Sequence, residues 1–228
     1  YFGGQFPDSL PEDPQATERL QETVAALSSY NHPSLPLDAQ AEPFLHHSFE
    51  VDDPKAASVG LLPVALQALH NNYTAGLTSI AVSVRGELPE LIYREKNATY
   101  RLPVGLGRPQ ITQLDINGDV YQVAASGRFT HDEEERPVFY IKLAFLETPS
   151  IRIIKLILTP EGLLLRQTEP PGVPYVFKKL RRAADTALYK PLLLLALGGT
   201  EEDYLRYKTL QLISPEISLR PISQNNCQ

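Results

Sequence analysis

The dipeptide Asn117-Gly118 constrains the fold of this chain more than any other sequence feature. It separates two short segments, residues 111–116 and 119–124, in which apolar and polar side chains alternate. Asparagine and glycine accept the positive φ angles that a two-residue hairpin requires. The two segments are therefore predicted to pair as antiparallel strands. Similar segments recur along the chain with turn residues about every eight to twelve positions, which is typical of an all-β domain rather than of alternating strands and helices.

The remaining predicted strands are short, rich in β-branched or aromatic residues and bounded by turn signals. They cover residues 44–51, 77–85, 91–94, 99–104, 138–146, 151–158 and 163–167. The segment from Val59 to His70 fits either a helix interrupted at Pro63 or a strand broken there. We expect a mainly β fold, either an antiparallel β-sandwich or an open barrel, with flanking helices at the N- and C-terminal ends.

Three regions follow from this pattern. Residues 1–43 are predicted to form a tail, a helix and a linker, with Asp13 capping a helix over residues 14–30 and Pro14 in its first turn. Residues 44–172 form the β-sandwich domain. Residues 173–228 form a helical segment and a tail, whose last part, 214–228, is either an added strand or an extended end.

Composition excludes several functional classes. The formal net charge of the 228 residues is −6, which argues against a nucleic-acid partner held through phosphate contacts. Hydrophobic residues make up 43% of the chain, enough for a core of its own. The single cysteine, Cys227, cannot form an intrachain disulfide.

The sequence predicts no metal site and no cofactor. His46 and His47 are adjacent, so on a strand their side chains point to opposite faces. The acidic residues 132–135 are better explained as a solvated turn than as a cation site. An enzyme with paired carboxylates is the least favoured class, although Glu50, Asp52 and Glu147 are available for that chemistry.

Two motifs concern modification and partners. Asn72 and Asn97 each begin an N-glycosylation tripeptide, which favours a secretory compartment. A basic cluster near the carboxyl end suits an anionic partner, unless it is a polar helix face; its residues are Lys178, Lys179, Arg181 and Arg182. The longest apolar stretch, Leu192 to Leu197, is too short to span a bilayer and is either buried or in contact with a membrane, which places membrane proximity near Leu188–Leu197.

Five aromatic residues lie at predicted strand positions: Tyr93, Tyr100, Tyr121, Phe139 and Phe145. Packing in the core or across strands is the favoured interpretation. A platform on which sugar rings stack is the alternative, and it requires these side chains to be exposed on one concave face.

Several segments resemble subunit 10 of the endoplasmic-reticulum membrane protein complex. Residues 47–53 (HSFEVDD) resemble the opening strand of that family, and residues 100–104 (YRLPV) resemble a later strand. Residues 111–123 resemble its strand-glycine-strand hairpin, and residues 158–162 (LTPEG) are similar to fungal members. The matches keep their order over about residues 44–165. The paired cysteines of animal members are missing, and only residues 188–197 stand where the family's membrane helix is expected.

The resemblance implies a non-catalytic β-sandwich in the lumen of the endoplasmic reticulum, working as one subunit of a membrane-protein insertase. Its partners would be larger protein subunits, and no catalytic residue would be carried over. Without the resemblance, a secreted or periplasmic β-sandwich that binds a sugar or a lipid is the alternative. A periplasmic or extracellular location then replaces the lumenal one.

Overall fold

The computed structural model describes residues 13–28, 35–37, 39–51, 53–170 and 214–222. The chain divides into two compact units, Tyr1–Pro33 and Ser34–Gln228. The first contains helix α1 (Pro14–Ser28). Asp13 caps this helix as predicted, because its Oδ1 accepts hydrogen bonds from the backbone N–H groups of Gln15 and Ala16, at 3.0 and 3.1 Å.

The second unit is mainly β, as predicted. Besides helix α2 (Val64–His70) and two short 3₁₀ turns, η1 (Glu42–Phe44) and η2 (Pro54–Ser58), its described part contains eleven strands. The strands are β1 (His47–Val51), β2 (Leu77–Arg85), β3 (Leu88–Glu95), β4 (Thr99–Pro103), β5 (Gly105–Leu106), β6 (Gln110–Ile116), β7 (Asp119–His131), β8 (Pro137–Phe145), β9 (Ser150–Thr159), β10 (Gly162–Thr168) and β11 (Glu216–Pro221).

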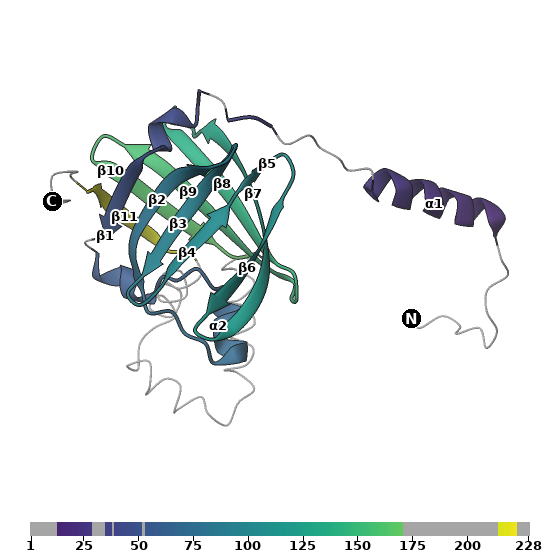
Figure 1. Ribbon diagram of the computed structural model, residues 1–228, viewed down its shortest axis with the longest axis horizontal. Coiled ribbons are helices and arrows are strands. Elements are labelled where there is room, and N and C mark those ends of the chain that lie inside the picture. Colours follow the sequence, from purple (N-terminus) through teal and green to yellow (C-terminus); the bar gives the residue numbers. More distant parts are fainter. Residues whose placement is uncertain (1–12, 29–34, 38, 52, 171–213, 223–228) are drawn as a thin grey trace, which may run out of the picture. The chain divides into compact units, whose positions relative to one another are not determined.

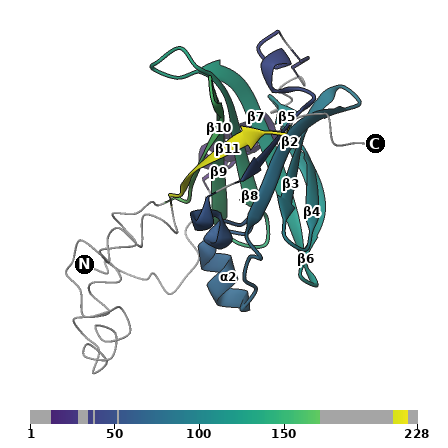
Figure 2. The same ribbon diagram turned by 90° about the vertical axis from the view of Figure 1, so that its left-hand side faces the viewer.

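All these strands belong to one sheet, in the order β4-β3-β2-β1-β11-β10-β9-β8-β7-β5, with β6 paired to β7. The sheet curls until β4 contacts β6 and β3 contacts β5, and the N–H of Val104 donates to the carbonyl oxygen of Pro89 at 2.8 Å. In both views the strands β2 to β4 face β7 to β10 across the interior (Figure 1, Figure 2). The result is a nearly closed, barrel-like sheet.

The hairpin predicted from the Asn-Gly pair is confirmed. Asn117 and Gly118 have φ angles of 54° and 92°, and β6 pairs with β7 from Gln110↔Ala125 to Ile116↔Asp119. Strand β7 runs to His131, seven residues beyond its predicted end at 124, because its second half pairs with β8. Most other strands lie within two or three residues of their predicted ends. One pairing departs from the antiparallel expectation, since β5 runs parallel to β7.

Two local predictions change at the amino-terminal side of the sheet. The strand expected over residues 44–51 begins only at His47, because Glu42–Phe44 forms a 3₁₀ turn that buries the Phe44 ring. The expected linker up to residue 43 is in part packed against the sheet: Ala41 is fully buried, and the N–H of Leu35 donates to the carbonyl oxygen of Leu106 at 2.8 Å.

The segment from Val59 to His70, left open by the sequence, is a coil followed by a helix. Pro63 precedes the first turn of α2, where its missing N–H and fixed φ are tolerated. Asn71 ends the helix in the left-handed conformation, with φ 52° and ψ 36°.

Strand β11 corrects the predicted boundaries of the sheet. It lies between β1 and β10, pairing with both, so the residues of the sheet extend beyond the range 44–172. The alternative of an added strand within residues 214–228 is therefore the one that the structure shows. The helices predicted within residues 173–210 lie outside the described residues.

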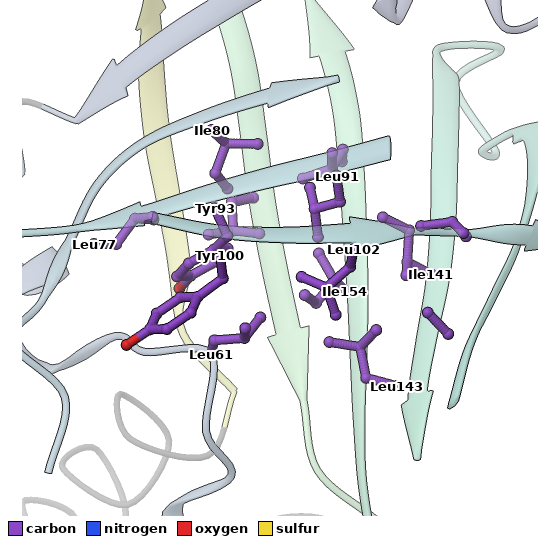
Figure 3. Packing of buried hydrophobic residues seen from close by; sticks show 14 of the residues in the cluster. Leu61, Leu77, Ile80, Leu91, Tyr93, Tyr100, Leu102, Ile141, Leu143 and Ile154 are labelled. Atoms are coloured by element: carbon purple, nitrogen blue, oxygen red, sulfur yellow. The ribbon is translucent and has the colours of Figure 1, made fainter. Parts of the chain in front are cut away.

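The curled sheet encloses a packed core. Side chains from β3 and β4 meet those from β8 and β9 in its interior (Figure 3). At one end of this core the rings of Phe129 and Phe139 stack with centroids 4.2 Å apart, and Phe44 packs on both. Phe44 and Phe139 are fully buried and Phe129 partly so; each fully buried ring contributes about 1.5 to 3 kcal/mol through removal of apolar area from water.

Candidate functional site

Helix α2 and the loops around it close one end of the curled sheet, and both views place α2 at the end where β6 turns into β7 (Figure 1, Figure 2). We call this the α2 end. Polar side chains that point inward from the strands meet the loop backbone here. Strand residues alternate between the two faces, so a polar residue in register with core residues must be buried.

Glu95, at the end of β3, is 5% exposed and holds the loops before and after α2. Its Oε1 accepts the N–H of Leu61 at 3.0 Å. Its Oε2 accepts the hydroxyl of Thr74 at 2.6 Å and the N–H of Ala75 at 3.0 Å. Each oxygen of the carboxylate therefore accepts a hydrogen bond from a loop, which is how a buried charge becomes tolerable.

Arg152 on β9 is 1% exposed and forms the second inward charge. One of its Nη atoms donates to the carbonyl oxygen of Leu62 at 2.7 Å and to the carboxylate of Glu169. The other donates to Gln167 Oε1. Glu169 in turn accepts the N–H of Val64 at 2.9 Å, which fixes the first turn of α2. The buried ion pair thus links strand β9 to the helix.

Burial and charge also affect two tyrosines at this end. Burial, and after it the negative charge of Glu95, raise the pKa of Tyr100 to about 12. The pKa of Tyr93 rises for the same two reasons, and its hydroxyl accepts a hydrogen bond from Gln167 Nε2 at 3.1 Å. Both phenols stay neutral at physiological pH.

A second polar cluster joins α2 to the β6–β7 hairpin. Asn72 Nδ2 donates to the carbonyl oxygen of Ile116 at 2.7 Å and to Asp119 Oδ2 at 2.8 Å, and Asn117 Nδ2 donates to Asn72 Oδ1 at 2.8 Å. His70 Nδ1 and the hydroxyl of Tyr121 are 2.8 Å apart, and the two rings stack. These contacts attach the helix to the hairpin.

Large apolar side chains remain exposed around the same end. Leu69 is 72% exposed, Tyr73 62%, Val120 53% and Leu146 52%. They come from α2, from the loop after it, from the start of β7 and from the turn after β8. We call these four residues the apolar rim. Single exposed hydrophobic residues are common on folded domains, and these four share one end of the sheet.

The structure places the two predicted glycosylation sites in different surroundings. Asn97 is exposed in the turn between β3 and β4, whereas Asn72 is 6% exposed and engaged as described above. The four basic residues Lys178, Lys179, Arg181 and Arg182 and the apolar segment 188–197 lie outside the described residues. No helix in the described ranges has the length and apolarity needed to cross a bilayer.

The five aromatic residues predicted to pack are all buried, between 0% and 4% exposed. They therefore do not form the exposed platform that the sugar-stacking alternative requires. Glu50 lies on β1, and Glu147 lies in the turn that follows β8. In the sheet, β1 and β8 are separated by β11, β10 and β9. Asp52 lies outside the described residues.

The acidic turn at residues 132–135 is organised by Arg136. This guanidinium donates to Asp132 at 2.8 Å and pairs with Glu134 at 3.0 Å. The hydrogen bond from Arg136 lowers the pKa of Asp132. Within the described residues no group of three or more histidine, cysteine, aspartate or glutamate side chains could hold a metal ion.

Sequence reasoning missed the inward charges Glu95, Arg152 and Glu169. A signal was present: Glu95 continues the alternation of Leu91 and Tyr93, and Arg152 that of Ile154. A charged residue in register with core positions predicts a buried partner.

Comparison of the chain with protein-family models, with curated proteins and with solved structures gives no match. The geometry at the α2 end is therefore the basis for the functional argument.

Proposed function

We propose that the chain is a non-catalytic binding and scaffold module that attaches to protein subunits of a larger complex through the apolar rim. The observation that carries this proposal is a contrast at the α2 end. The inward carboxylates of Glu95 and Glu169 are occupied by backbone N–H groups and by Arg152, whereas the four rim side chains are turned to solvent. Exposed leucine and tyrosine at one place suit a protein interface better than chemistry.

The hydrogen bonds of the α2 end support this role. Glu95, the Arg152–Glu169 pair and Asn72 connect α2 and its loops to strands β3, β6, β7 and β9. A surface held in this way is ordered before it meets a partner, which reduces the entropy lost on binding. We also class the curled sheet as an open barrel rather than a sandwich, since one path of strand pairing joins its strands.

The resemblance supplies the finer proposal: a lumenal subunit of a membrane-protein insertase in the endoplasmic reticulum. The segments that carry the resemblance lie in strands, as the resemblance requires: residues 47–51 in β1, 100–103 in β4 and 111–123 in the β6–β7 hairpin. In this role the domain packs on larger lumenal subunits and supports insertion of client transmembrane segments. No residue of the chain is assigned a catalytic step.

Substitution of the rim tests the scaffold role. The tagged chain is purified from its source in mild detergent, with Leu69→Lys/Val120→Lys compared against wild type. We expect integral membrane subunits to co-purify with wild type at fixed stoichiometry, and their recovery to fall by about tenfold or more in the double variant, because lysine cannot be buried at an apolar contact.

Leu35→Lys is the matched control, since Leu35 is 55% exposed and lies outside the rim. Circular dichroism and thermal unfolding show whether each variant is folded. Recovery of the same subunits with the double variant, or equal loss with Leu35→Lys, contradicts the assignment of the rim.

The two sequons give a separate prediction on location. If the chain is made in the secretory pathway, Asn97 carries the glycan and Asn72 does not, because both N–H groups of the Asn72 amide are engaged inside the fold. Asn97→Gln then removes the glycan in a gel-shift assay with a glycosidase. Asn72→Gln leaves the glycan in place and lowers stability by about 1 to 3 kcal/mol. A glycan on Asn72 contradicts this placement. If the native protein carries no glycan at all, the two sequons no longer support the lumenal location.

A further inference from the structure

The outer face of strands β8, β9 and β10 contains a hollow of about 240 Å³. Its lining residues are Tyr140, Ile153, Lys155, Arg166 and Thr168. The sheet register places them in two adjacent rows, Tyr140↔Lys155↔Arg166 and Ile153↔Thr168. These positions alternate with interior ones, so the hollow lies on the solvent side of the sheet.

Charge is segregated on this face. The chain as a whole has a net charge of −6, yet the outward positions of β7 to β10 carry Arg128, Lys142, Lys155 and Arg166 and no aspartate or glutamate. Arg128 lies over the ring of Tyr140, 4.6 Å from its centroid, and so extends the first row by one strand. The hollow therefore lies on a positive part of an acidic protein, which ends at Glu216, the partner of Arg166 in the next strand, β11.

Two cations face each other directly in the hollow. Lys155 and Arg166 are cross-strand partners on β9 and β10, an arrangement in which like charges destabilise the pair. Arg166 is partly compensated, because its Nε donates to Glu216 at 2.6 Å. Among the described residues no ion pair is recorded for Lys155. A negative group seated between these two side chains would relieve their repulsion.

We propose that this hollow binds the phosphate group of a phosphorylated ligand. An ammonium group, the remaining N–H groups of a guanidinium, and the hydroxyls of Thr168 and Tyr140 supply donors for several oxygens of one tetrahedral anion. A phosphate monoester carries about −1.5 to −2 charges at neutral pH and so compensates both cations, whereas a carboxylate compensates one. Ile153 provides an apolar wall for the group to which the phosphate is attached. The site is on another part of the sheet from the apolar rim and does not depend on the scaffold role.

The test uses the full chain and two probes that share the phosphate group. Inorganic phosphate, followed by isothermal titration calorimetry, represents a soluble ligand. Vesicles of phosphatidylcholine with and without phosphatidic acid, whose headgroup is a phosphate monoester, represent a lipid source and are followed by co-sedimentation. We expect at least one probe to bind and Lys155→Gln and Arg166→Gln each to weaken that binding by about tenfold, as for loss of a charged hydrogen-bond donor.

Arg94→Gln is the matched control, since it makes the same change in net charge on β3, at an exposed position outside the hollow. It should weaken binding less than about twofold, as expected for a distant, screened charge. Binding of phosphate identifies a soluble source, and binding only of vesicles with phosphatidic acid identifies a lipid source. Either result supports the proposal if the binding depends on Lys155. Absence of binding to both probes overturns it, as does equal weakening by Arg94→Gln and Lys155→Gln.

Discussion

Replacement of Glu169 by glutamine is expected to lower the free energy of unfolding by about 3 to 5 kcal/mol, because it leaves the charge of Arg152 buried without its partner. Arg152 is 1% exposed and is the largest of the fully buried side chains in the described part of the chain. Glutamine keeps an oxygen that can accept the hydrogen bond from the N–H of Val64, so the start of α2 is preserved. The loss of stability then reflects the removal of the negative charge.

The ion pair between Arg166 and Glu216 is a matched control for this prediction. It also joins an arginine to a glutamate in the same sheet, but its side chains are 44% and 54% exposed. Arg166→Gln should therefore cost about 1 kcal/mol or less. Urea unfolding of both variants gives the comparison. Equal losses for Glu169→Gln and Arg166→Gln would show that the Arg152 ion pair does not stabilise the α2 end as described.

Glu95→Gln is expected to cost about 2 to 4 kcal/mol, since an amide has a single acceptor oxygen and cannot satisfy the donors on both sides of the carboxylate. The amide nitrogen of the glutamine then faces either the N–H of Leu61, or the hydroxyl of Thr74 and the N–H of Ala75, in place of an acceptor oxygen. Glu90→Gln is the control on the same strand. The side chain of Glu90 is itself only 6% exposed, but its partners Arg85 and Arg101 are more than half exposed and remain hydrated without it, so its replacement should cost less than that of Glu95.

The two tyrosines near Glu95 give this variant a second readout. The folded-state pKa of Tyr100 is raised from 10.0 to about 12, so the folded state retains a proton that the unfolded state loses. The stability supplied by the neutral phenol is therefore complete below pH 10 and falls as the pH rises from 10 toward 12. Removal of the Glu95 charge lowers the pKa of Tyr93 and Tyr100.

An ultraviolet titration of tyrosinate measures this shift. In Glu95→Gln, part of the absorbance change should move to lower pH than in wild type, while Glu90→Gln should follow wild type. A titration of Glu95→Gln that overlays the wild-type curve would contradict the assigned effect of the Glu95 charge, whatever the loss of stability.

The local elements of the fold could be predicted from the sequence because short-range rules determine them. The positive φ angles of Asn117 and Gly118, the strand Leu77–Arg85 and the Asp13 cap all follow from residues close together in the chain. The place of β11 between β1 and β10 depends on pairing with distant strands. Alternation of side chains marks Ile217 and Leu219 as strand positions but does not identify their neighbours.

The site was harder to predict for the same reason. Arg152, Glu169 and the α2 start are brought together by contacts such as Arg152 to Leu62, ninety residues apart. Their roles depend on the closure of the sheet, which no local pattern specifies. The sequon at Asn72 shows the converse: the motif is clear in the sequence, but hydrogen bonds to the distant residues Ile116 and Asp119 occupy its amide.

Site-specific photo-crosslinking in the native membrane fraction tests the central claim most directly, namely that the apolar rim is the surface that contacts partner proteins. A photoreactive amino acid replaces Leu69, or Val84, which lies near the β2–β3 turn and is 37% exposed. The account predicts crosslinks to the same co-purifying membrane subunits from position 69 and none from position 84. Crosslinks from position 84 alone, or from neither position while the subunits still co-purify, would contradict it.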